Sequence, residues 1–161
     1  MNKKLASTLA ALALIAGLGL SSAYAVDNMS STDAPDLTSV RAKIKAKDYA
    51  GALAQLRELA DDVQHADVYN LMGFTLRKGR TPDLAGSEKY YDAALRIDPH
   101  HRNTLEYSGE LYLMKGDLPR AQGRLAALQA ECGGQCEQFT QLRTAIADYQ
   151  AHGNKFVSTG W

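Results

Sequence analysis

Two cysteines, Cys132 and Cys136, are the residues whose type and spacing first suggest chemistry in this chain. They are its only cysteines, and they lie four positions apart in the segment ECGGQC. Such a pair can form a structural disulfide, exchange electrons as a redox-active dithiol, or supply two thiolates to a metal site. The choice among these depends on the cellular compartment and on the elements that surround the pair.

The segment 1–25 has the pattern of a secretory signal peptide. Lys3 and Lys4 precede an apolar run over 5–20, and the small residues of Ala-Tyr-Ala end at Ala25, the expected cleavage site. The apolar run is short for a membrane-spanning helix, which needs about 20 residues. We therefore expect a periplasmic or secreted protein without a membrane anchor after signal cleavage. An uncleaved N-terminal anchor is the alternative.

Cleavage would leave the segment 26–161, which is long enough for one domain with a hydrophobic core. Cleavage also removes two lysines from a chain with 18 basic and 18 acidic residues, so the net charge becomes −2. A near-neutral chain without a basic block is not expected to bind nucleic acid or an anionic membrane surface. The segments 26–35 and 152–161 are expected to be a flexible lead-in and a flexible tail.

The chain between these segments shows helical periodicity and an internal repeat. Gly73 and Gly109 occupy similar contexts, and Ala52, Ser87 and Ala121 recur at nearly the same spacing. Repeat periods between about 20 and 50 residues are typical of stacked structural units. Helices are expected at 36–46, 48–61, 66–78, 82–97, 101–114, 117–131 and 137–151.

Thr81-Pro82 is expected to start the fourth of these helices. Threonine is a common N-cap residue, and proline is favoured at the first helical position because its missing N–H is not needed there.

This period and pattern resemble the tetratricopeptide repeat (TPR) family from about residue 33 to residue 149. The resemblance implies an all-α fold, an α-solenoid of three TPR-like helical hairpins with repeats at about 33–65, 66–101 and 102–135. The TPR domain would cover 36–151. The helix 137–151 would cap the stack, with Phe139, Leu142, Ile146 and Tyr149 on its apolar face.

The resemblance also assigns positions that pack the repeats together. Gly73 and Gly109 are expected where the two helices of a hairpin approach closely. Three departures stand out, namely Val40 in place of a small residue, Ser87 in place of alanine, and an apparent two-residue insertion at Arg80-Thr81. The packing positions are Ala52, Gly73, Tyr91, Ala94, Pro99, Gly109, Tyr112 and Ala121.

In this family, the first helices of the hairpins line a concave groove that holds a peptide. Arg77 and Lys78 would form a small basic cluster there, which suits a segment with apolar and acidic residues. Glu106 and Glu110 are expected to face the groove or solvent as an i, i+4 pair. The candidate groove residues are Arg41, Asn70, Phe74, Arg77, Lys78, Asn103, Glu106, Tyr107 and Glu110.

The two cysteines now have a predicted place between the last repeat and the capping helix. An oxidising compartment and an even cysteine count favour a disulfide at this joint, with Gly133-Gly134 allowing the turn to close. Redox chemistry is less favoured because no strand precedes the pair and Glu131 and Glu137 would raise a thiolate pKa. A metal site would need further ligands, and no histidine is nearby in sequence.

The sequence contains no recognisable catalytic constellation or phosphate-binding loop, so we expect neither an enzyme nor a cofactor. The expected function is an exported adaptor that binds another protein or a peptide in the groove. The alternative is a thiol-redox or metal-binding periplasmic protein that uses Cys132 and Cys136. A third possibility is self-association, in which Phe156 and Trp161 of the tail dock into a neighbouring molecule.

Overall fold

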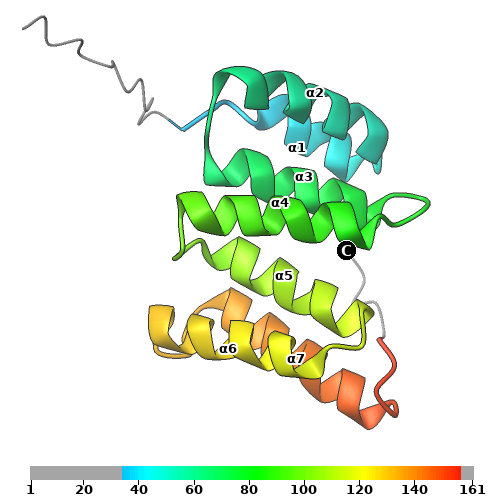
Figure 1. Ribbon diagram of the computed structural model, residues 1–161, viewed down its shortest axis with the longest axis vertical. Helices are drawn as coiled ribbons and strands as arrows, with labels where there is room; N and C mark the ends of the chain where they lie inside the picture. Colours follow the sequence, from blue (N-terminus) through cyan, green and yellow to red (C-terminus); the bar gives the residue numbers. More distant parts are fainter. Residues whose placement is uncertain (1–33, 157–161) are drawn as a thin grey trace, which may run out of the picture.

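A computed structural model of the protein describes residues 34–156. The predicted signal peptide and its cleavage site at Ala25 lie outside the described residues, as do residues 157–161. Between 34 and 156 the chain forms seven helices and no strand (Figure 1). These are α1 Thr38–Lys45, α2 Tyr49–Asp62, α3 Ala66–Lys78, α4 Leu84–Ile97, α5 Arg102–Met114, α6 Leu118–Cys132 and α7 Glu137–Ala151.

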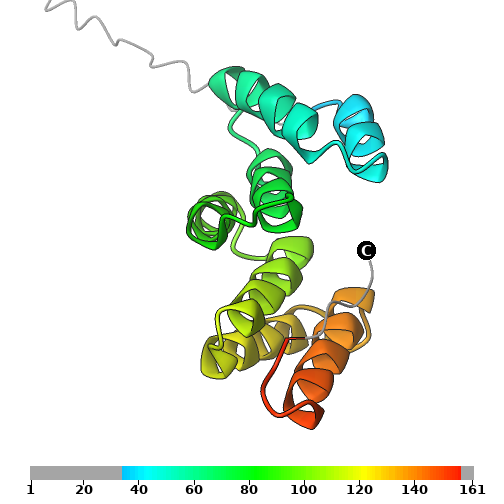
Figure 2. The ribbon, with the colours of Figure 1, turned by 90° about the vertical axis from the view of Figure 1, so that its right-hand side faces the viewer.

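The prediction of an all-α protein is confirmed for this part of the chain, and each expected helix lies within two residues of an observed one. Each helix packs on the next along the chain, α7 also packs on α5, and α3 touches α5. Figure 2 shows that α1 and α7 lie at opposite ends of the same side of the molecule, with α3 and α5 between them. No helix within 34–156 is long and apolar enough to cross a membrane.

The three helices α2, α4 and α6 begin in the same way. Asp48, Asp83 and Asp117 precede them, and each carboxylate accepts a hydrogen bond from the backbone N–H three positions later, at 2.9, 2.8 and 3.1 Å. Such caps satisfy one of the free N–H groups at a helix start. The three aspartates are almost evenly spaced along the chain, so the cap recurs with the period of the repeat.

The expected N-cap at Thr81 with Pro82 at the first helical position is wrong. Helix α4 begins at Leu84 because the Asp83 carboxylate, not the Thr81 hydroxyl, binds the free N–H of Gly86. Residues 79–83 join α3 to α4 and are two residues longer than the joints 46–48 and 115–117. The apparent insertion at Arg80-Thr81 therefore lies in this loop, which projects from the body in Figure 1.

Helices α3 and α4 approach each other closely at Gly73. A Cβ atom on this residue would lie 2.7 Å from the ring of Tyr91, so a larger side chain would push the helices apart. The Ser87 hydroxyl donates a 2.8 Å hydrogen bond to the Gly73 carbonyl, which gives the serine a role that alanine could not fill. Tyr91 and Ala94 are fully buried beside this contact.

Gly109 does not have the role expected from the repeat. The atoms nearest to an added Cβ there belong to Leu142 of α7, at 2.5 Å, and not to the second helix of its hairpin. The predicted apolar face of α7 is confirmed, since Phe139, Leu142, Ile146 and Tyr149 are buried. This face packs in one cluster with Tyr112, Ala121 and Leu128.

A second cluster lies at the other end of the molecule. Val40, which replaces the expected small residue, is fully buried there with Ala52 and Leu56. Pro99, in contrast, is exposed in the turn between α4 and α5, so it limits the helix instead of packing the repeats.

We predict that Asp83→Ala lowers the free energy of unfolding by about 1 kcal/mol, because α4 loses its N-cap hydrogen bond. Thr81→Ala serves as the matched control and should change stability by less than about 0.5 kcal/mol. Thermal and urea unfolding followed by circular dichroism measure both. A larger loss for Thr81→Ala than for Asp83→Ala would contradict this assignment of the cap.

Candidate functional site

A cavity of about 330 Å³ opens between α1, α3 and α5. We call it the inner cavity. Its lining combines apolar, aromatic and basic side chains and contains no acidic one. The lining residues are Arg41, Ile44, Lys45, Lys47, Tyr49, Leu71, Phe74 and Tyr107. A concave apolar surface with a few charged groups is the usual form of a binding site.

Aromatic rings form one wall of the inner cavity. The ring of Phe74 lies between those of Tyr49 and Tyr107, with centroids 6.4 and 5.2 Å away. The guanidinium carbon of Arg77 lies 5.7 Å from the centre of the Phe74 ring and 5.6 Å from that of Tyr107. Contacts at these distances are favourable and fix the orientation of the rings.

Arg77 does not form the basic cluster with Lys78 that the sequence analysis placed in the groove. Its side chain is only 3 % exposed, and its Nη1 atom lies 2.5 Å from a carboxylate oxygen of Glu110, which is also buried. Burial opposes the charge on Arg77, but Tyr91 and Glu110 outweigh burial and raise its pKa. The neighbouring Lys78 is half-buried, and burial, with the charge of Arg77, lowers its pKa.

Glu106 is the second correction to the predicted groove. This residue is 2 % exposed, and its Oε1 atom has no hydrogen-bond partner within the described part of the chain. Burial, followed by repulsion from Glu110, raises the pKa of Glu106 to about 8. The carboxyl is therefore largely protonated at neutral pH, and it is not an exposed negative charge.

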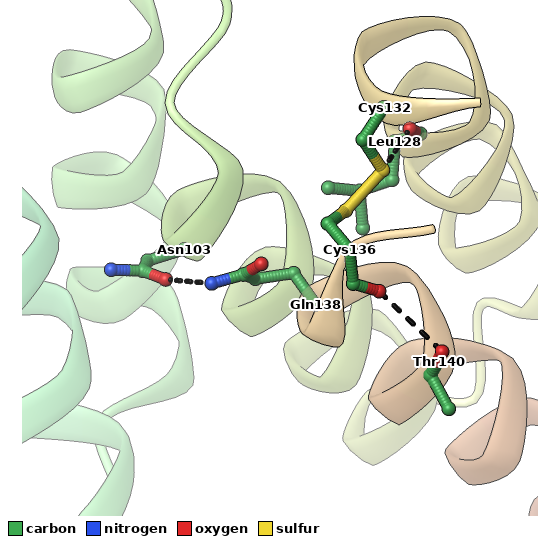
Figure 3. The surroundings of a disulfide bond; sticks show 6 residues. All are labelled: Asn103, Leu128, Cys132, Cys136, Gln138 and Thr140. Atoms are coloured by element: carbon green, nitrogen blue, oxygen red, sulfur yellow. Dashed lines mark hydrogen bonds between the residues drawn. A yellow bond between two sulfur atoms is a disulfide. The ribbon is translucent and has the colours of Figure 1, made fainter. Parts of the chain in front are cut away.

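The remaining predicted groove residues divide by exposure. Asn70 is buried and accepts a 3.1 Å hydrogen bond from the hydroxyl of Thr104, and Phe74 is also buried. Asn103 is half-buried and accepts a 2.7 Å hydrogen bond from Gln138 of α7 (Figure 3). Tyr107 is half-buried, and Arg41 is exposed. Only part of the predicted set is thus accessible to a ligand.

The basic rim of the inner cavity was not among the features predicted from the sequence. Lys45, Lys47 and Tyr49 lie where α1 ends and α2 begins, and none of them was among the candidate groove residues. The alternation of Lys43, Lys45 and Lys47 was the available signal in the sequence. Lys45 and Lys47 are exposed.

The predicted pairing of Cys132 with Cys136 is confirmed. The two residues form a disulfide with their Cα atoms 5.8 Å apart, which joins the end of α6 to the start of α7 (Figure 3). Gly133 and Gly134 between them have φ values of 60° and 77°, a conformation that glycine adopts without strain. Among residues 34–156 no group of three or more His, Cys, Asp or Glu side chains could hold a metal ion.

We predict that Glu106→Gln changes the pH dependence of stability. The pKa of Glu106 rises from an ordinary 4.5 to about 8 in the folded protein, so its contribution to stability is full below pH 4.5 and is lost as the pH rises through 8. The variant should match the parent protein at pH 4 and exceed it by roughly 1–3 kcal/mol at pH 9. Urea unfolding across this pH range measures the difference.

Glu58→Gln, at an exposed position of α2, is the control for loss of one carboxyl group. Its stability should follow that of the parent protein at every pH. If the curves of Glu106→Gln and the parent protein stay parallel from pH 4 to pH 9, Glu106 is not a buried neutral carboxyl.

Comparison of the chain with family models, with curated proteins and with solved structures finds no match. The resemblance to the tetratricopeptide repeat therefore stays a prediction from the sequence.

Proposed function

We propose that the protein is a non-catalytic adaptor that binds a segment of another protein in the inner cavity. The observation that carries this proposal is the combination, in one concave surface, of an aromatic wall with exposed basic side chains. The residues that dominate the affinity of protein interfaces are enriched in tryptophan, tyrosine and arginine. The cavity holds one or two side chains of a partner, which suits a short segment better than a whole domain face.

The charge of the cavity indicates the chemistry of the partner. Arg77 is neutralised by Glu110, so the exposed cations of the lining are Lys45, Lys47 and Arg41, the last of which also lies 4.0 Å from a carboxylate oxygen of Asp67. A segment with an aromatic or aliphatic anchor next to one or more carboxylates would match this surface. The anchor would contact Phe74 and Tyr107, and the carboxylates would lie near the basic rim.

The repeat architecture belongs to the same proposal. The aspartate caps recur at nearly equal intervals at the start of α2, α4 and α6, and successive helices pack on one another. We interpret the three hairpins as TPR-like units of a short α-solenoid, with α7 as the cap. A single hairpin cannot bury its apolar face, so stacking would supply the stability.

Export is also part of the proposal. The pattern of the segment 1–25 suggests a secretory signal, and disulfides persist mainly in oxidising compartments. The adaptor would act in the periplasm or outside the cell, with a protein or peptide as its partner and without a cofactor.

The proposal is tested by placing a photo-crosslinking amino acid at Lys45, which lines the inner cavity, in cells that export the chain. We expect Lys45 to capture a specific protein and Arg57, an exposed residue of α2 outside the cavity, to capture none. Lys47→Glu with Arg41→Glu should lower the capture roughly tenfold, because the rim loses its attraction for carboxylates. Arg57→Glu is the control for a change of net charge.

Equal capture from Lys45 and Arg57, or capture that survives both charge reversals, would argue against binding in the inner cavity. Mass spectrometry of the crosslinked product identifies the partner and the segment that contacts Lys45.

A further inference from the structure

The chain turns back toward the side of the inner cavity after α7. Gly153 and Asn154 follow α7 with φ values of 67° and 61°, and the Asn154 N–H donates a 2.9 Å hydrogen bond to the Tyr149 carbonyl. This hydrogen bond reverses the chain direction at the helix end. In Figure 2 the red segment after α7 returns along α7 toward α5.

Phe156, the last described residue, ends this return beside Arg77. Its side chain lines a second cavity of about 330 Å³ together with Arg77, Glu110 and Met114. The Arg77 guanidinium also lies against the rings of Phe74 and Tyr107, which line the inner cavity. One side chain, that of Arg77, therefore stands between the position of Phe156 and the aromatic wall of the inner cavity.

We propose that residues 157–161, with the sequence VSTGW, occupy the inner cavity of their own chain, with Trp161 as the anchor against Phe74 and Tyr107. This inference rests on the proposed function, because it makes the tail a competitor of the partner for the same surface. Five extended residues span roughly 16–18 Å, and one side chain, that of Arg77, separates Phe156 from the aromatic wall.

The chemistry of the segment fits that of the cavity. A tryptophan has a large apolar surface that matches the aliphatic and aromatic lining, and Arg41, Lys45 and Lys47 can place their cations over the indole ring. The segment carries no acidic side chain, so it offers the basic rim fewer carboxylates than a partner segment with several acidic residues would. A partner with both an aromatic anchor and a carboxylate would displace it.

The occupant is the tail of the same chain and not of a second copy because of its tether. Phe156 lies across the Arg77 side chain from the aromatic wall, and a short tether gives an effective concentration on the order of millimolar. A second molecule at micromolar concentration cannot compete with such a tail unless it binds much more tightly.

The fluorescence of the full exported chain tests the proposal, because Trp161 is its only tryptophan. We expect a blue-shifted emission and protection from acrylamide quenching, both unchanged from roughly 0.1 to roughly 50 µM protein. Ile44→Asp, which places a negative charge in the apolar part of the cavity, should shift the emission to that of solvent-exposed tryptophan. Arg57→Asp is the control, and circular dichroism verifies that both variants are folded.

A peptide experiment keeps the test independent of Ile44. A labelled peptide with the sequence NKFVSTGW is titrated into the parent protein and into full-length Trp161→Ala. The variant, whose cavity is vacated, should bind the peptide at least tenfold more tightly than the parent protein. The same peptide with alanine in place of tryptophan should bind neither.

Two results would overturn the proposal. The first is a solvent-like emission of Trp161 in the parent protein together with equal peptide binding by the parent and Trp161→Ala. The second is a protection of Trp161 from acrylamide that disappears on dilution while the molecular mass of the protein in solution halves. This result would mean that the tail binds the cavity of a second copy. If either result is found but crosslinking from Lys45 still captures a partner, only the tail proposal fails and the adaptor function stands. If Trp161 is protected but no partner is captured, the tail proposal stands and only the adaptor function fails.

Discussion

The ion pair between Arg77 of α3 and Glu110 of α5 is the contact on which the wall of the inner cavity depends. Both side chains are almost fully buried, and taking two such charges out of water costs several kcal/mol unless they compensate one another at close range. The 2.5 Å contact provides this compensation and holds α3 against α5. Phe74 and Tyr107 lie one helical turn before the two charges, so the ion pair also fixes the rings that form the wall of the inner cavity.

The pairing of α3 with α4 rests on a contact of a different kind. Tyr91 packs directly against the backbone at Gly73, and Ser87 donates a hydrogen bond to the same glycine's carbonyl. The close contact leaves no room for a side chain at position 73, while the hydrogen bond satisfies a polar serine in a buried position. The aspartate caps then set where each second helix begins. Separate contacts thus fix the helix ends, the spacing of α3 and α4, and the packing of α3 on α5.

Much of the fold could be predicted because it depends on patterns among residues that are close in sequence. The helical periodicity located all seven helices of the described segment, and the apolar face of α7 followed from four residues at helical spacing. The disulfide followed from an even cysteine count and two glycines between the cysteines. The aspartate caps could have been found too, since Asp48, Asp83 and Asp117 share the repeat period. The N-cap of α4 was instead assigned to Thr81, because Thr81-Pro82 is a common start of a helix.

The candidate site was harder to predict, because its character depends on residues that are distant in sequence. Arg77 and Glu110 come from different repeats, and nothing local distinguishes a buried, paired arginine from an exposed one. Glu106 was misplaced for the same reason, since helical spacing identifies a face but not the helix that covers it. Gly109 was assigned to its own hairpin because the repeat pattern does not encode the contact with Leu142 of α7.

A double-mutant cycle on Arg77→Met and Glu110→Gln tests most directly whether the buried ion pair holds α3 against α5 at the wall of the inner cavity. Each single variant removes one charge from a buried pair and should lose about 3–5 kcal/mol of unfolding free energy. The double variant should recover at least about 2 kcal/mol of the summed loss, because neither charge is then left buried without the other. Losses that simply add would show that α3 and α5 are held together by other contacts, and would contradict this account.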